Sequence, residues 1–156
     1  MIEIRLFRDT DAAKTAEMIA TTLKISNNRD YSEKFIEENI KSHDADVLIQ
    51  KAKNGHFFVA CDKEKIVGCG GITGYWGSLT ESYIMTVFVL PDYQKQGIGK
   101  KIIQTLEDDE IFKRAERTEI AASITACDFY KKMGYTLKDA TRGVDEYGTI
   151  RLEKFK

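Results

Sequence analysis

The sequence contains little proline, cysteine or histidine, and each shortage excludes a class of protein. Its 156 residues include 1 proline, so a proline-rich linker or an extended disordered chain is not expected. The cysteines Cys61, Cys69 and Cys127 are odd in number and form no CxxC pair. Even with His43 and His56 they offer neither a disulfide framework nor the spacing of a structural zinc site. The sequence therefore predicts a metal-free domain of a reducing, cytoplasmic compartment.

The chain also lacks an excess of one charge and a long apolar run. Its 24 Lys and Arg balance 25 Asp and Glu, whereas nucleic-acid binding requires a basic face. No apolar stretch approaches the roughly 20 residues of a membrane span. The N-terminal residues MIEIRLFRDTD carry charge from the third position and lack the apolar core of a secretory signal. We therefore expect no nucleic-acid partner, no membrane partner, and a single domain, since no repeat or linker interrupts the chain.

The spacing of apolar residues predicts secondary structure that changes along the chain. Residues 2–6 alternate as a half-buried strand, and Asp9 or Thr10 is expected to cap the helix that follows. Ser32 and Asp44 open two further helices, or one bent helix. Later segments predict strands at 56–61, 66–75, 83–90, 119–123, 135–138 and 146–153, with helices at 98–113 and 125–133. This order predicts an α/β or α+β sheet with helices on both faces.

Residues 87–103 form the segment with the clearest chemical meaning. An apolar strand ends at Pro91, and a loop with Gly97 and Gly99 leads into a helix. The first amides of a helix have no intrahelical partner and carry partial positive charge. Glycines leave those amides accessible, and Lys95, Lys100 and Lys101 add cations. The segment therefore suits a phosphate or diphosphate group.

Two other phosphate-binding motifs fail on residue identity. A Walker A loop aligned on Gly99 needs glycine at Gln94 and serine or threonine at Lys101. A dinucleotide fingerprint begun at Gly97 needs glycine at Ile102. A nucleotide-binding regulatory domain is therefore disfavoured.

The loop instead resembles the acyl-coenzyme A loop of the GNAT N-acetyltransferase superfamily, [QR]-x-x-G-x-[GA]. Residues 94–99 read QKQGIG, and residues 87–93 resemble the strand that precedes the loop in that family. Residues 123–135, SITACDFYKKMGY, resemble a second signature, N-x-x-A-x-x-[FL]-Y-x-x-x-G-[FY], with Ser123 in place of asparagine. The resemblance covers essentially the whole chain, although the N-terminal third matches in pattern only.

The resemblance implies a fold and a cofactor. The fold is a mixed, mostly antiparallel sheet of about six to seven strands, with helices on both faces and a splayed central parallel pair. The pantetheine arm of acetyl-CoA would lie between strands 83–90 and 118–123, and no metal is implied. The expected cofactor-binding residues are Val87, Phe88, Val89, Gln94, Lys95, Gln96, Gly97, Ile98, Gly99, Lys100, Ser123 and Cys127. For Ser123 a strand-end role, and for Cys127 a buried thiol, are the alternatives.

The resemblance also suggests catalytic residues. Tyr130 matches a tyrosine that protonates the departing thiolate, although a tyrosine of the core would fit the same spacing. The family often carries a glutamate within the fourth strand, where this chain has Ile84, Met85 and Thr86. Glu81 is the nearest acidic candidate for a general base, acting through water; otherwise it is a solvated residue at the strand end.

The acceptor site is less determined. Asn28 and Tyr31 lie in the loop between helices that borders the acceptor in relatives. Tyr75 and Trp76 could form a wall of the acceptor pocket or simply fill the edge of the core, and Tyr83 is a further candidate for acceptor contact. The expected acceptor is a primary amine of a small molecule or peptide. The C-terminal strand could pair across a homodimer or remain an unpaired edge.

Two functions follow from these patterns. The first is an acetyl-CoA-dependent N-acetyltransferase that transfers the acetyl group directly within a ternary complex. The second is a non-catalytic CoA-binding sensor or interaction module of the same fold, suggested by Ser123 and by the missing carboxylate in the fourth strand.

Overall fold

A computed structural model describes residues 1–139 and 143–156 of the chain. Within them the strands form one seven-stranded sheet in the order β1-β2-β3-β4-β5-β7-β6. The strands are β1 (Ile2–Leu6), β2 (His56–Asp62), β3 (Lys65–Gly74), β4 (Glu81–Val89), β5 (Arg117–Ser123), β6 (Thr136–Leu137) and β7 (Thr149–Phe155). The strand pairs are antiparallel except β4 with β5, which run parallel. This is the mixed, mostly antiparallel sheet that the resemblance implied.

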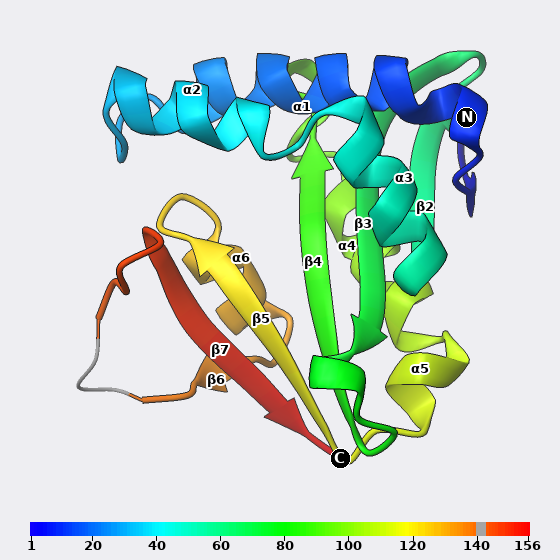
Figure 1. Cartoon of the computed structure of the whole chain (residues 1–156), viewed down its shortest axis with the longest axis vertical. Coiled ribbons are helices and arrows are strands. Elements are labelled where there is room, and N and C mark those ends of the chain that lie inside the picture. Colours follow the sequence, from blue (N-terminus) through cyan, green and yellow to red (C-terminus); the bar gives the residue numbers. More distant parts are fainter. Residues whose placement is uncertain (140–142) are drawn as a thin grey trace.

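Helices cover both faces of the sheet (Figure 1). They are α1 (Ala12–Ser26), α2 (Glu33–Lys41), α3 (Ala45–Asn54), α4 (Ile98–Glu107), α5 (Glu110–Lys113) and α6 (Cys127–Lys132). One apolar core cluster joins α4 and α6 to the sheet, and a second joins α1, α2 and α3 to the other face of β2 and β3. In the described part of the chain, no helix has both the length and the apolar character of a membrane span.

Two helix boundaries differ from the expected ones. Asp9 and Thr10 form a single 3₁₀ turn, and α1 begins only at Ala12. The carboxylate of Asp11 explains the turn, because it accepts hydrogen bonds from the Arg8 amide and from Arg5. The helix expected over 98–113 is two helices, because the Asp109 side chain accepts from the Ile111 amide and caps α5. The helices that begin after Ser32 and Asp44 are separate, and each of those side chains caps its helix.

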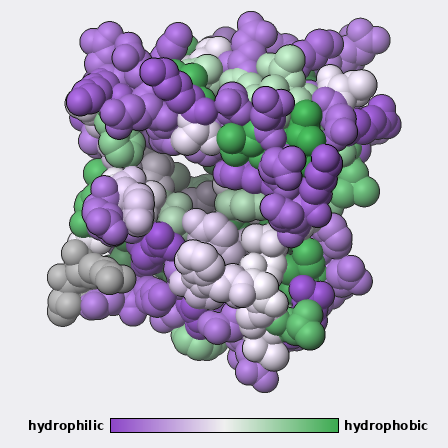
Figure 2. Space-filling model, viewed as in Figure 1, coloured by the Kyte–Doolittle hydropathy of each residue, from purple (hydrophilic) through white to green (hydrophobic). Residues whose placement is uncertain are grey.

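The feature that positions the site is the divergence of β4 and β5. Their parallel pairing covers only Glu81–Ile84 of β4 and ends at the pair Ile84 and Ile120. Beyond this point β4 stays paired with β3, while β5 continues with β7. The sheet therefore opens as a V, with β4 on one side and β5 and β7 on the other (Figure 1). Figure 2 shows the molecule hollowed between these two sides and the helices α1 and α2.

Candidate active site

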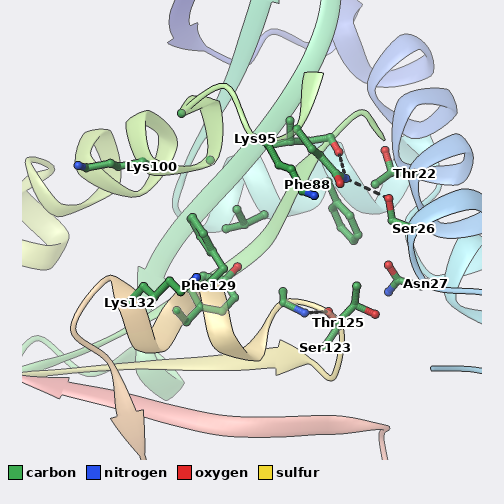
Figure 3. Close-up of a pocket in the computed structure, with 17 residues that line it drawn as sticks. Thr22, Ser26, Asn27, Phe88, Lys95, Lys100, Ser123, Thr125, Phe129 and Lys132 are labelled. Atoms are coloured by element: carbon green, nitrogen blue, oxygen red, sulfur yellow. Dashed lines mark hydrogen bonds between the residues drawn. The ribbon is translucent and has the colours of Figure 1, made fainter. Parts of the chain in front are cut away.

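A cavity of about 480 Å³ lies at the open end of the V. Its walls come from the last turn of α1, the second half of β4, the loop before α4, the turn after β5, and α6 (Figure 3). The structure brings to it most of the residues expected from the sequence. These are Val87, Phe88, Val89, Gln94, Lys95, Gly97, Gly99, Lys100, Ser123 and Tyr130.

The β4 wall of the cavity is irregular in a way that exposes its backbone. The pairing of β3 with β4 shifts between Cys69 and Gly71, so that Thr86 and Val87 together face Gly70. This is a β-bulge, and Thr86 adopts a φ of 57°, which is costly for a β-branched residue. Because β5 has already separated, the backbone of residues 87–89 has no partner among the described strands on the side of the cavity. Apart from the Val89 carbonyl, which accepts a hydrogen bond from the Gln94 side chain, the peptide groups on that side are therefore available to a ligand.

The loop before α4 exposes a second set of backbone groups. Gly97 precedes the helix with a φ of 83°, a left-handed conformation that favours glycine. The first helical hydrogen bond found there runs from the Lys101 amide to the Gly97 carbonyl, so helix geometry leaves the amides of residues 98–100 without an intrahelical partner. Gln94 secures the loop, since its side-chain amide donates to the Val89 carbonyl at 2.9 Å and to Ser26 Oγ at 3.0 Å.

The charge of the cavity is one-sided. Lys95, Lys100 and Lys132 line it, and no carboxylate is among the 17 lining residues of the described chain. In Figure 3, Lys100 comes from α4 and Lys132 from α6. Helix-terminal amides and three ammonium groups together suit a ligand with several negative charges, such as a diphosphate.

Tyr130 projects from α6 into the same cavity. The residue is buried, and burial raises the pKa of its phenol well above the ordinary value. Within the described residues its hydroxyl has no hydrogen-bond partner, although Phe129 and Tyr135 pack against its ring. The hydroxyl is thus protonated at neutral pH and available to a bound molecule.

Ser123 lies at the end of β5, where the expected motif has asparagine. Its hydroxyl accepts a hydrogen bond from the Ala126 amide at 3.1 Å and so shapes the turn into α6. Ser123 also lines the cavity, and the bond from Ala126 does not use its hydroxyl proton, so the side chain has both a structural contact and a donor for a ligand.

Other expected residues lie elsewhere. Glu81 is at the paired end of β4, where its carboxylate accepts from Arg117 Nε at 2.8 Å, and it does not line the cavity. Ile98 is the first residue of α4, and its side chain is buried in the core. The exposed Gln96 side chain donates to the Asp92 carbonyl. Cys127 is buried in the same core as Ile98, on a face of α6 away from the cavity. The backbone amide of Ile98 remains part of the helix terminus.

The residues expected to contact an acceptor are dispersed. Trp76 lies in the turn between β3 and β4, is 92% exposed and is remote from the cavity. Asn28 is exposed, whereas its neighbour Asn27 lines the cavity. Tyr31 bridges two segments, since its hydroxyl donates to the Gly148 carbonyl and accepts from the Ile124 amide. Tyr83 is half-buried on β4, beside the ring of Tyr75.

Sequence reasoning missed several lining residues. Thr22, Ser26 and Asn27 are spaced along one face at the end of α1, but nothing local shows that this face meets the loop before α4. Phe129 belongs to the second motif and directly precedes Tyr130, so the motif itself contained the signal. Thr125 and Lys132 also line the cavity. Lys132 follows Tyr130 by two residues, and only the packing of α6 turns it toward the cavity.

The described chain contains no group of three or more His, Cys, Asp or Glu side chains able to hold a metal ion. The site consists of backbone amides, lysines and a tyrosine hydroxyl at the point where two parallel strands diverge. These features are those of an acyl-CoA-dependent transferase.

The family comparison agrees with this class. Residues 53–137, more than half of the chain, match the acetyltransferase (GNAT) domain model, so the chain belongs to the GNAT acetyltransferase family. No curated protein sequence matches the chain significantly.

Solved structures share the fold along nearly the whole chain. The PaiA N-acetyltransferase of Thermoplasma acidophilum in complex with coenzyme A is similar with a TM-score of 0.85 at 20% identity, covering 100% of this chain and 99% of that one. A GCN5-related N-acetyltransferase of Rhodopseudomonas palustris has a TM-score of 0.81 at 22% identity, covering 99% and 95%. A GNAT-family acetyltransferase of Staphylococcus aureus Mu50 has a TM-score of 0.77 at 16% identity, covering 99% of each chain. At these identities the likeness shows the fold alone.

Proposed function

We propose that this protein transfers the acetyl group of acetyl-CoA to a primary amine of a small molecule or peptide. The observation that carries the proposal is the continuity of the cavity. It extends from the amides and lysines at the start of α4 to the gap between β4 and β5, where the Tyr130 hydroxyl has no hydrogen-bond partner among the described residues.

The residues present fit acetyl-CoA by charge and shape. The amides of residues 98–100, with Lys95, Lys100 and Lys132, would hold the diphosphate. The backbone of residues 87–89 would bond the pantetheine arm as a neighbouring strand does. Acetyl-CoA supplies an acetyl thioester, which an amine can attack directly.

Tyr130 would act as the general acid. As the new C–N bond formed and the C–S bond broke, sulfur would gain negative charge and the phenol would donate its proton there; the nitrogen would release its excess proton to water, and the phenol would regain a proton from the same water. Burial raises the pKa of Tyr130, so the group keeps its proton until that charge develops. An amide of residues 87–89 would stabilise the charge on the carbonyl oxygen.

No carboxylate lines the described cavity, and Glu81 is bound to Arg117 at the other end of β4. The acceptor amine would therefore lose its proton to water before it attacks. Turnover should rise with pH as the neutral fraction of the acceptor grows.

The test is release of free coenzyme A from acetyl-CoA, measured with and without a panel of primary amines. Tyr130→Phe should lower kcat by about a hundredfold while CoA affinity stays within about twofold, because only the proton donor is lost. Tyr135→Phe is the matched control, since Tyr135 is buried near Tyr130 but its hydroxyl donates to Glu107. This control should turn over like the wild type.

Two results would contradict the proposal. Equal kcat in Tyr130→Phe and wild type at every pH would remove Tyr130 from the acid role. Tight CoA binding without amine-stimulated release by any amine would instead favour a non-catalytic CoA-binding module.

A further inference from the structure

Lys51 is a half-buried lysine that the proposed chemistry does not use. It lies in the last turns of α3, and its ammonium donates to Thr86 Oγ1 at 2.6 Å. Burial lowers the pKa of this lysine. A cation in such surroundings ordinarily has an anionic partner, because loss of hydration is otherwise uncompensated.

Lys51 has no carboxylate partner within residues 1–139 and 143–156. The other partly buried cations of the described chain do have one: Arg5 with Asp11, Arg117 with Glu81 and Glu119, Arg151 with Asp145, and Lys154 with Glu107. The groups near Lys51 supply no negative charge either. Burial raises the pKa of the Cys69 thiol to about 12 and lowers that of His43, so both are neutral at neutral pH.

Lys51 lies close to the candidate active site. Its partner Thr86 belongs to the β4 bulge, two residues beyond the last pairing with β5 and next to the cavity-lining Val87. The His43 ring packs edge-on against Phe88, another lining residue, with centroids 5.5 Å apart. The helix α3 covers the sheet face opposite α4 (Figure 1), so Lys51 reaches the bulge from the face opposite the proposed diphosphate site.

We infer that the acceptor carries a carboxylate, and that this carboxylate pairs with the Lys51 ammonium and the Thr86 hydroxyl. The inference rests on the proposed function and names its substrate class: amino acids or related amino-carboxylates. Successive residues of a strand are about 3.3 Å apart. A carboxylate held at Thr86 therefore places a nearby amine beside Val87, where the strands have separated.

The experiment compares the standard amino acids with their carboxamides as acceptors, in wild type and in Lys51→Met. The amine has a different basicity in the amino acid and in its carboxamide. Each enzyme is therefore described by the ratio of kcat/KM for the amino acid to kcat/KM for the carboxamide. Basicity cancels when the ratios of the two enzymes are compared. Loss of a charge-assisted contact should lower the ratio in Lys51→Met about tenfold to a hundredfold, mainly through KM. Lys51→Arg should recover part of the ratio.

Lys53→Met is the matched control, because Lys53 lies on the same helix but is exposed. Its ratio should equal that of the wild type. An unchanged ratio in Lys51→Met would overturn the inference while leaving acetyl transfer intact.

A chain that turns over no amine would contradict the proposed function instead. The inference would then be decided by calorimetric titration of the same amino acids into the CoA-loaded protein. Binding by wild type that Lys51→Met loses would support the inference; no binding, or equal binding by both, would overturn it.

Discussion

The two ends of β4 have different surroundings. At its first residues the strand pairs with β5, and Glu81 joins a cluster in which Arg117 also bonds Glu119 and Glu153. At its last residues the strand is no longer paired with β5 and contains a bulge. It faces a cavity lined by lysines and by no carboxylate among the described residues.

One strand is therefore part of the scaffold at one end and, in the proposed function, a binding surface at the other. At the paired end, backbone groups bond to β5 and each charged side chain bonds to another. At the open end, backbone amides and ammonium groups have no such partners among the described residues, which is what binding an external anion requires. The change occurs at Ile84 and Ile120, where the parallel pairing stops.

A substitution at the paired end should have the largest effect on the free energy of unfolding. The Glu119 carboxylate is fully buried and bonds Arg117, Lys138 and Arg151. Glu119→Ala leaves these cations without their shared partner, and should lower the free energy of unfolding by about 3–5 kcal/mol. Urea denaturation measures the change. Glu116→Gln, an exposed neighbour before β5, should leave the midpoint nearly unchanged.

The same cluster should make stability depend on acidic pH. Burial by itself would raise the pKa of Glu119, but hydrogen bonds from Lys138 and Arg117 hold it below the ordinary 4.5. A carboxyl with a lowered pKa in the fold stabilises it above the unfolded pKa, and this contribution is lost as pH falls below that value. In Glu119→Gln that part of the acid dependence should be absent; an identical acid profile would contradict the assignment.

A substitution at the open end should affect CoA binding more than it affects folding. Gly97→Ala and Gly77→Ala place the same side chain at similar left-handed φ, 83° and 77°, with open space around each. Each should lose about 1–2 kcal/mol of unfolding free energy. Only Gly97→Ala should weaken CoA binding, by about tenfold, because it displaces the amides at the start of α4. Calorimetry with CoA separates the two, and equal affinity in both variants would refute the role of the loop.

The smallest effect should come from a single cavity lysine. Lys132→Gln removes one exposed ammonium and should weaken CoA binding about twofold to fivefold, since exposed ion pairs contribute about 0.2–1 kcal/mol. The effect should shrink as salt is raised. Lys131→Gln, next to it on α6, changes the same net charge outside this cavity and should bind CoA like the wild type.

Local sequence predicted much of this fold. Alternating apolar residues located β1, a short polar turn located the β2–β3 hairpin, and Ser32 and Asp44 marked two helix starts. The break between α4 and α5 was missed, because residues 98–113 keep helical spacing and only Asp109, which caps α5 and also bonds His56, interrupts it. The 3₁₀ turn before α1 was missed because Asp11, which shapes it, is held by Arg5 of β1.

The candidate site likewise contains residues that local sequence could locate and residues that it could not. The loop at residues 94–100 could be located from sequence, since glycines and a helix start are local features. Asn27 and Lys51 could not, because their relation to β4 depends on how helices pack across the sheet. Glu81 was a plausible base by position along the strand, but in the fold Arg117 binds it at the end remote from the cavity.

The amino-acid sequence by itself determined the elements, their order, and a helix start suited to a diphosphate, because hydrophobic spacing, capping and glycine act over a few residues. The tertiary structure decided where β4 leaves β5, which charges find partners, and that Lys51 is left without a carboxylate within the described chain. Those outcomes depend on residues far apart in sequence, whose burial and pairing exist only once the sheet and its helices have packed.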